Sequence, residues 1–207
     1  MSILLSYGFL GAVAGPTAMI FGHSVARNEA APWELPIGLG RWVLPVGVAT
    51  AAVLCFVAAR VPSFAAPVSW LLITGMVLAS VDWTCHRLPH RVTGLLICGG
   101  VALLGLVGVG QLIRSVAALT VVFACGITVH LLSRRALGLG DVTLAAAVAL
   151  FLGWFSWRHV AAGISVALLI TAITTATLWA AHLTRAGCGV ALGPGLIFGS
   201  VYVIVQF

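Results

Sequence analysis

The chain of 207 residues is 62% apolar and only 7% charged, with 10 basic residues, 4 acidic residues and a formal net charge of +6. A soluble domain carries about 25% charged residues, so this composition excludes an ordinary water-soluble globular protein. Disorder is excluded as well, because it requires low hydrophobicity together with high charge. We therefore expect an integral membrane protein.

Charged residues divide the sequence into eight neutral runs, and most of these are long enough to cross a bilayer, which takes about 20 apolar residues of helix. In chain order, the predicted helices cover 3–22, 42–59, 67–82, 92–113, 115–132, 141–157, 160–183 and 192–206. No repeat and no hydrophilic linker marks a second domain. The predicted fold is all-α: a polytopic transmembrane bundle of about eight helices (six to eight) in a single integral-membrane domain, 1–207.

The arginines predict how this bundle is oriented. The connections after odd-numbered helices hold seven of them: Arg27, Arg41, Arg87, Arg91, Arg134, Arg135 and Arg185. The connections after even-numbered helices hold three: Arg60, Arg114 and Arg158. Basic residues favour the cytoplasmic side, which predicts cytoplasmic odd connections and external termini in the cytoplasmic (inner) membrane. The positive charge then reflects topology, and no nucleic-acid partner is expected.

Small and polar residues inside the predicted helices indicate close helix packing. Gly11 with Gly15, and Gly195 with Gly199, have the G-x-x-x-G spacing that lets two helices approach closely. Four threonines of the seventh helix, between 171 and 177, predict hydrogen bonds to a neighbouring helix. The scattered cysteines and histidines lack metal-ligand spacing, so neither a metal nor a cofactor is expected.

Two of the four acidic residues, Asp82 and Asp141, fall at predicted membrane boundaries. Ionisable groups at membrane depth are costly and indicate function. The helix ending at Asp82 runs inward and the helix beginning at Asp141 runs outward, so both carboxylates are predicted at the cytoplasmic face. Two carboxylates at one depth can share a proton: the ionised one activates water and the neutral one protonates the scissile carbonyl. That is the chemistry of an aspartic protease.

Structural roles for these aspartates remain open. Asp141 would also serve as a helix N-cap, and Asp82 would also form an ion pair with Arg87 or Arg91. The glycines before Asp141, Gly138 and Gly140, permit the close backbone approach that an extended peptide substrate requires.

Two motifs surround the aspartates. Six residues separate Asp82 from Pro89, which lies within Leu88-Pro89-His90, and Gly138-Leu139-Gly140-Asp141 is a G-x-G-D sequence followed by Thr143 and Leu144. Together they resemble the type IV prepilin peptidases, GxGD-type intramembrane aspartyl proteases. Leu88 and His90 stand where that family prefers Ile and Asp or Asn, and Thr143 stands where Lys is usual. Weaker matches are Gly11–Arg27, the small-residue helix 145–154 and Leu192-Gly193-Pro194.

The resemblance implies that the chain cleaves the short leader from type IV prepilins or pilin-like precursors at the cytoplasmic membrane face. It implies Asp82 and Asp141 as catalytic residues, with Gly138, Gly140 and Pro89 beside the substrate. Bifunctional relatives carry a zinc-binding methyltransferase domain between helices 1 and 2, where this chain has only the loop 23–41. We therefore expect peptidase activity without N-methylation.

Parts of the sequence also fit three other functions. A presenilin-type protease also has G-x-G-D, but Val81 replaces its tyrosine before the first aspartate and no late Pro-Ala-Leu occurs. A transporter or channel would use the same aspartates for protons or cations. An inactive scaffold of a pilus or secretion machine is a further alternative, because Thr143 stands where active relatives usually have Lys. The sequence names neither the precursor nor the oligomeric state.

Overall fold

The computed structural model describes residues 2–27, 40–85, 90–133, 138–180 and 192–206. Within these ranges there are eight α-helices and no strand, which confirms the predicted all-α fold. The helices are α1 (Ser2–Arg27), α2 (Gly40–Arg60), α3 (Ala65–Cys85), α4 (His90–Val107), α5 (Val109–Leu132), α6 (Leu139–Gly153), α7 (Trp157–Ala180) and α8 (Gly193–Gln206). A 3₁₀ turn, Pro62–Phe64, joins α2 to α3.

Two predicted connections differ from the structure. The loop expected at 23–41 is shorter, because α1 continues to Arg27 and α2 already begins at Gly40. The break expected at Arg114 lies instead at Gly108, whose backbone is extended (φ 177°, ψ 121°). Arg114 is therefore a residue of α5 and not of a connection.

Six helices are long and apolar enough to cross a membrane, namely α1 to α5 and α7. The two others, α6 and α8, have 15 and 14 residues. At about 1.5 Å per residue they measure roughly 22 Å, less than the hydrocarbon core of about 30 Å. The chain is thus a multi-pass membrane protein with six candidate spans and two shorter apolar helices.

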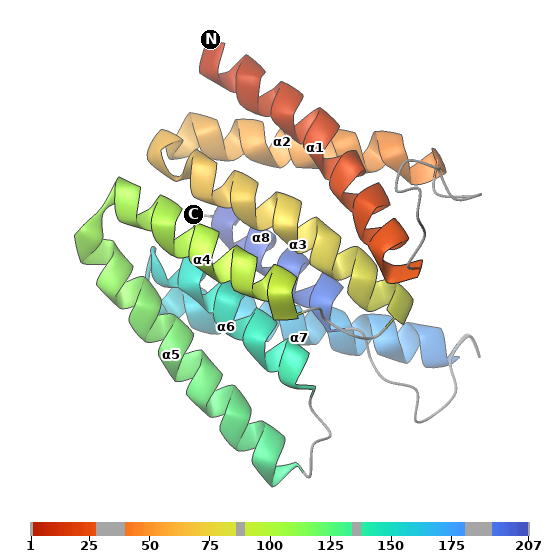
Figure 1. Ribbon diagram of the computed structural model, residues 1–207, viewed down its shortest axis with the longest axis vertical. Helices are drawn as coiled ribbons and strands as arrows, with labels where there is room; N and C mark the ends of the chain where they lie inside the picture. Colours follow the sequence, from red (N-terminus) through yellow and green to blue (C-terminus); the bar gives the residue numbers. More distant parts are fainter. Residues whose placement is uncertain (1, 28–39, 86–89, 134–137, 181–191, 207) are drawn as a thin grey trace.

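Helix α3 lies at the centre of the bundle (Figure 1). It contacts α1 and α2 on one side and α4, α6 and α8 on the other. Of its apolar segment, 67% is buried, against 17–28% for the other five candidate spans. The side chains of α3, taken together, are therefore more enclosed by protein than those of any other candidate span.

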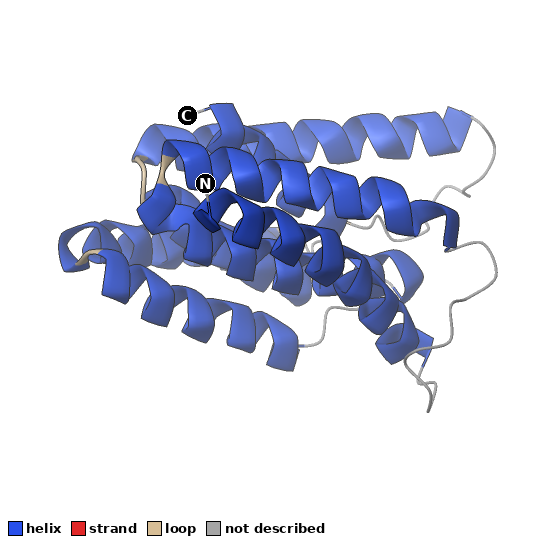
Figure 2. Ribbon diagram, turned by 90° about the horizontal axis from the view of Figure 1, so that it is seen from above, coloured by secondary structure: helices blue, strands red, loops and turns tan. Residues whose placement is uncertain are grey.

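The helix ends divide between the two ends of the bundle. The described connections at 61–64, 108 and 154–156 lie at one end (Figure 2), and the C-terminus of α3 and the N-termini of α6 and α8 lie at the other (Figures 1 and 2). Three helix ends that are far apart in sequence are thus collected at one end of the bundle.

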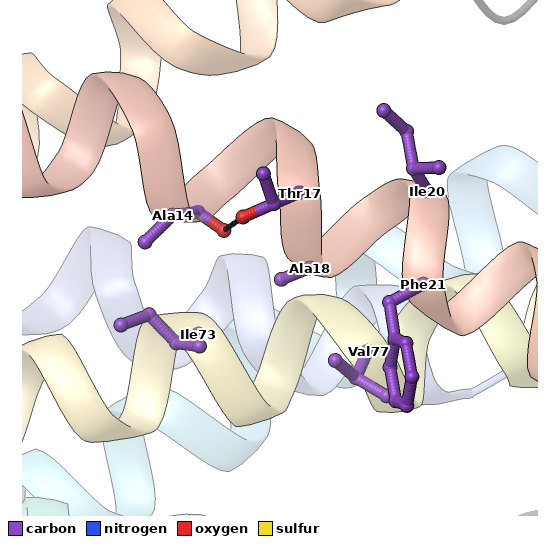
Figure 3. A pocket seen from close by; sticks show the side chains of 7 residues that line it. All are labelled: Ala14, Thr17, Ala18, Ile20, Phe21, Ile73 and Val77. Atoms are coloured by element: carbon purple, nitrogen blue, oxygen red, sulfur yellow. Dashed lines mark hydrogen bonds between the residues drawn. The ribbon is translucent and has the colours of Figure 1, made fainter. Parts of the chain in front are cut away.

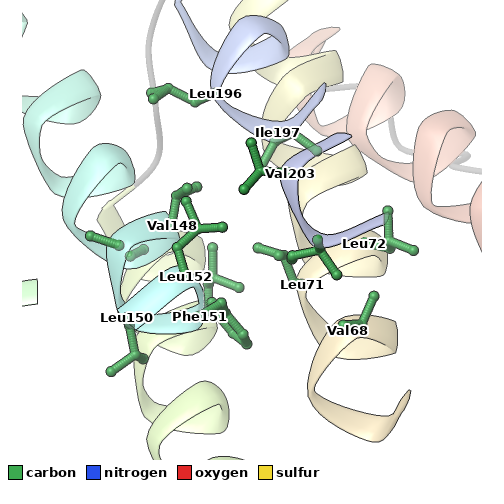
Figure 4. Close-up of a cluster of buried hydrophobic side chains, with 14 of the residues drawn as sticks. Val68, Leu71, Leu72, Val148, Leu150, Phe151, Leu152, Leu196, Ile197 and Val203 are labelled. Carbon is green, nitrogen blue, oxygen red and sulfur yellow. The ribbon is translucent and has the colours of Figure 1, made fainter. Parts of the chain in front are cut away.

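Helix α6 forms the middle of the apolar core. All of its residues from 146 to 153 are buried, as expected for a helix that is apolar on every side. Its Val148, Phe151 and Leu152 face Leu71 of α3 and Val203 of α8 (Figure 4). This packing fixes α3, α6 and α8 relative to one another.

Both G-x-x-x-G pairs lie at close helix contacts, as predicted. A Cβ on Gly11 would lie 2.6 Å from Ala51 Cα of α2, and a Cβ on Gly199 would lie 2.8 Å from Ala167 Cα of α7. The prediction for the α7 threonines was wrong: the hydroxyl groups of Thr171, Thr174, Thr175 and Thr177 bond carbonyls of their own helix. A threonine in a helix satisfies its donor this way without any partner helix.

Arg114 ties α5 to the C-terminus of α6. Its Nε donates to the carbonyl of Gly153 at 2.8 Å, and its guanidinium also donates to the carbonyl of Trp154. Carbonyls at a helix C-terminus lack intrahelical partners and carry partial negative charge, so a cation there is stabilising.

Replacing Arg114 by Met is expected to destabilise the protein by about 1–3 kcal/mol, because two carbonyls lose charged donors. The measurement is the melting temperature of the detergent-solubilised protein. Arg158→Met, on an exposed residue of α7, is the matched control and should melt close to wild type. Equal melting temperatures for the two variants would contradict this role for Arg114.

Candidate active site

Asp82 lies three residues before the end of α3 and is 4% exposed. Its Oδ2 accepts a hydrogen bond of 2.8 Å from the backbone N–H of Gly193, the first residue of α8. A buried carboxylate without hydrogen bonds would be strongly destabilising. The N-terminus of α8 compensates for part of this cost, because it combines unpaired N–H donors with the positive end of the helix dipole.

Asp141 is the third residue of α6 and is half-buried. The proposed N-cap role is wrong, because the N-cap residue is Gly138. The Asp141 carboxylate instead accepts a hydrogen bond from the Gly138 backbone. An acidic residue at this position commonly reaches back to the N-cap N–H, so local geometry holds the Asp141 side chain at the helix start.

The two aspartates interact electrostatically. Asp141 lies outside the six candidate spans. The pKa of its carboxyl is raised from 3.8 to about 6, mainly by burial and also by the negative charge of Asp82, while the hydrogen bond from Gly138 opposes this rise. Two neighbouring carboxyl groups that disfavour simultaneous ionisation can exchange a proton near neutral pH.

The predicted substrate residues Gly138 and Gly140 are both next to Asp141, at the start of α6. A Cβ on Gly138 would lie 2.9 Å from Asp141 Oδ2, so a side chain there would displace the carboxylate. The Gly138 carbonyl accepts from the Val142 N–H at 3.2 Å, and the Gly140 carbonyl accepts from Thr143 Oγ1 at 2.8 Å. The Thr143 hydroxyl is thus hydrogen-bonded to the backbone of the G-x-G-D sequence itself.

The third predicted substrate residue, Pro89, lies outside the described residues, as do Arg87 and Leu88. Its role stays a prediction, and so does an ion pair between Asp82 and Arg87. In the described part of the chain, His90 begins α4 and is exposed, and so is Arg91. Among the described residues there is no group of three or more histidine, cysteine or acidic side chains that would hold a metal.

An apolar groove of about 480 Å³ lies between α1 and α3 (Figure 3). Its lining residues come from five positions of α1 and two of α3: Ala14, Thr17, Ala18, Ile20, Phe21, Ile73 and Val77. The Thr17 hydroxyl bonds the carbonyls of Val13 and Ala14 and so offers the groove no unpaired donor. Neither aspartate lines this groove, which is therefore separate from the pair of carboxylates.

Comparison with protein families matches residues 66–181 to the type IV leader peptidase family. The match covers more than half of the chain and includes both aspartates and the G-x-G-D sequence. The chain belongs to the type IV leader peptidase family. Comparisons with curated proteins and with solved structures find no match. Membership in this family identifies a membrane peptidase of the prepilin-processing type, which confirms the resemblance inferred from the motifs.

One residue of the site was not predicted from the sequence. Gly193 contacts Asp82 although 111 residues separate them. The sequence offered one signal, the Leu192-Gly193-Pro194 segment, but nothing in a single chain indicates that this segment meets the end of α3.

Replacing Asp141 by Asn is expected to raise the melting temperature at pH 8 and leave it almost unchanged near pH 4. The pKa in the folded protein, about 6, lies above the unfolded value of 3.8. Folding is therefore favoured most at low pH and loses this contribution as the pH rises through 6. Asn cannot ionise, so its advantage should appear only where wild-type Asp141 is charged.

Melting curves of both proteins in the same detergent at pH 4, 6 and 8 measure this difference. If Asp141→Asn lowers the free energy of unfolding by about 1 kcal/mol at every pH, the expectation is contradicted, and Asp141 then stabilises α6 only through its hydrogen bond to the Gly138 backbone.

Proposed function

We propose that this type IV leader peptidase family member is an aspartic endopeptidase that removes the short leader from type IV prepilins or pilin-like precursors at the cytoplasmic membrane face. The observation that supports this most directly is the electrostatic coupling of Asp141 to Asp82. The two carboxyl groups differ in environment, as a general acid and a general base must.

The different environments of the two carboxyl groups support a separate role for each. Asp82 accepts a backbone hydrogen bond at the positive end of α8, which suits a carboxylate that stays ionised and acts as the base. Asp141, with its pKa raised to about 6, keeps its proton at a higher pH than an ordinary aspartate and acts as the acid.

Hydrolysis then follows without a covalent intermediate. The Asp82 carboxylate takes a proton from a water whose oxygen attacks the scissile carbonyl carbon, and Asp141 gives its proton to the carbonyl oxygen. The resulting gem-diol collapses as the C–N bond breaks. Asp82 returns its proton to the leaving nitrogen, and a hydroxyl proton of the gem-diol goes to Asp141. Both carboxyl groups recover their starting states and one water is consumed.

The orientation predicted from the arginines suits a precursor whose leader stays in the cytoplasm. In that orientation the Asp82 end of α3 and the Asp141 end of α6 face the cytoplasm, where the leader of a precursor meets its apolar helix. Gly138, Gly140 and Pro89 would border the extended peptide around the scissile bond. The segment between α1 and α2 is short and lacks paired cysteines, so we propose no N-methyltransferase activity.

Asp82→Asn and Asp141→Asn are each expected to lower the cleavage rate by about 100-fold or more, because each removes a proton acceptor or donor of the reaction. The measurement is cleavage of a pilin-like precursor by purified protein in proteoliposomes, with melting curves to verify folding.

Glu29→Gln and Glu34→Gln apply the same acid-to-amide change to the two other acidic residues and serve as matched controls that should retain cleavage. If both aspartate variants cleave as fast as wild type, the aspartic mechanism is wrong. If wild type itself leaves every pilin-like precursor intact, the peptidase proposal fails.

The cleavage rate of wild type should be constant below about pH 6 and fall about tenfold for each pH unit above it, as Asp141 loses the proton that it donates. Initial rates at saturating precursor between pH 5 and 8 measure this dependence. A rate that rises across this range would contradict the assignment of Asp141 as the acid.

A further inference from the structure

The first turn of α8 is fitted closely around Asp82. Gly193 is buried, and its N–H donates to Asp82 Oδ2 at 2.8 Å. Leu192 caps the helix, since its carbonyl accepts from the Leu196 N–H at 3.0 Å. Pro194 has no N–H, and a proline is tolerated in a first turn because the N–H would have no intrahelical partner there. Gly193 is thus the residue of this turn whose N–H binds the carboxylate.

There is no space for a side chain at this position. A Cβ on Gly193 would lie 2.7 Å from Asp82 Oδ2, 3.1 Å from its Cβ and 3.2 Å from its Cγ. Oδ2 and Cγ belong to the carboxylate itself, and Cβ is the single carbon that joins it to the backbone of α3. Any residue other than glycine must therefore turn the carboxylate or shift the start of α8.

The start of α8 cannot shift freely, because the rest of the helix is packed on two sides. Gly195 and Gly199 contact Ala167 of α7. Ile197 fits against Gly75 of α3, where a Cβ would lie 2.7 Å from Ile197 Cδ1. Side chains from α8 also enter the apolar core (Figure 4). A side chain at 193 would therefore act mainly on the orientation of the Asp82 carboxylate.

We infer that Gly193 is a positioning residue for hydrolysis: its N–H and its missing side chain hold the Asp82 carboxylate in the orientation in which it takes a proton from the attacking water. This inference rests on the proposed aspartic mechanism and adds α8 to the catalytic machinery. It gives Gly193, the first residue of α8, a function in the reaction. A small displacement of a catalytic group is enough to lower a rate constant by about 100-fold.

The test compares Gly193→Ala with Gly199→Ala, which adds the same methyl group to the same helix at its contact with α7. Gly193→Ala should lower kcat by about 10- to 100-fold with KM within about twofold of wild type, because only the chemical step loses its geometry. Gly199→Ala should lower the melting temperature and keep kcat within about threefold. Steady-state cleavage kinetics and melting curves of both variants in proteoliposomes supply these values.

A kcat for folded Gly193→Ala within about threefold of wild type would overturn the inference. The inference would also be overturned if the two variants lost equal amounts of melting temperature and showed the same decrease in kcat. If Gly193→Ala does not fold, glycolic acid at position 193, introduced by nonsense suppression during cell-free synthesis into nanodiscs, removes the N–H without adding a side chain. The same loss of kcat is expected there, and an unchanged kcat would overturn the inference.

Asp82→Asn in the same assay separates this inference from the proposed function. An inactive Asp82→Asn beside a fully active Gly193→Ala overturns only the role of Gly193. A fully active Asp82→Asn overturns the aspartic mechanism and the role of Gly193 together.

Discussion

A buried carboxylate near the end of the central helix is the constraint on which the rest of the site depends. Asp82 is 4% exposed, and a buried charge requires hydrogen bonds or an opposite charge close by. The N-terminus of α8 supplies a backbone donor without adding a titratable group. For α8 to start there, its glycines must pack on α7 and its apolar side chains must enter the core. The short α6, buried in the same core, brings Asp141 into the electrostatic field of Asp82.

Much of this architecture follows from local sequence patterns. Charge-free runs predicted the eight helices, because an apolar segment of helix length has few alternatives in a membrane. The alternation of helix direction was sufficient to predict that Asp82 and Asp141 lie at one end of the bundle. The spacings of Gly11 with Gly15 and Gly195 with Gly199 predicted close contacts. Two glycines on one helix face let the backbone of a neighbouring helix approach closely in any bundle.

The features that sequence reasoning missed depend on contacts between distant segments. Composition separates α4 from α5 at a charge, Arg114, whereas the chain breaks at Gly108. Arg114 lies within α5 because carbonyls at the end of α6 accept hydrogen bonds from it. The threonines of α7 suggested hydrogen bonds between helices, but their hydroxyl groups donate to carbonyls one turn back in the same helix, as Thr171 does to Ala167. The contact of Gly193 with Asp82 depends on how α3, α7 and α8 pack against one another, and a single sequence does not give that arrangement.

Titration of Asp141 by infrared spectroscopy measures the coupling of the two carboxyl groups in the folded protein. The chain has only four acidic residues, so the C=O stretch of a protonated Asp141 is assignable by its loss in Asp141→Asn. We expect a midpoint near pH 6 in wild type and a lower midpoint in Asp82→Asn, because the neighbouring negative charge is gone. An identical midpoint in wild type and Asp82→Asn would contradict a shared site.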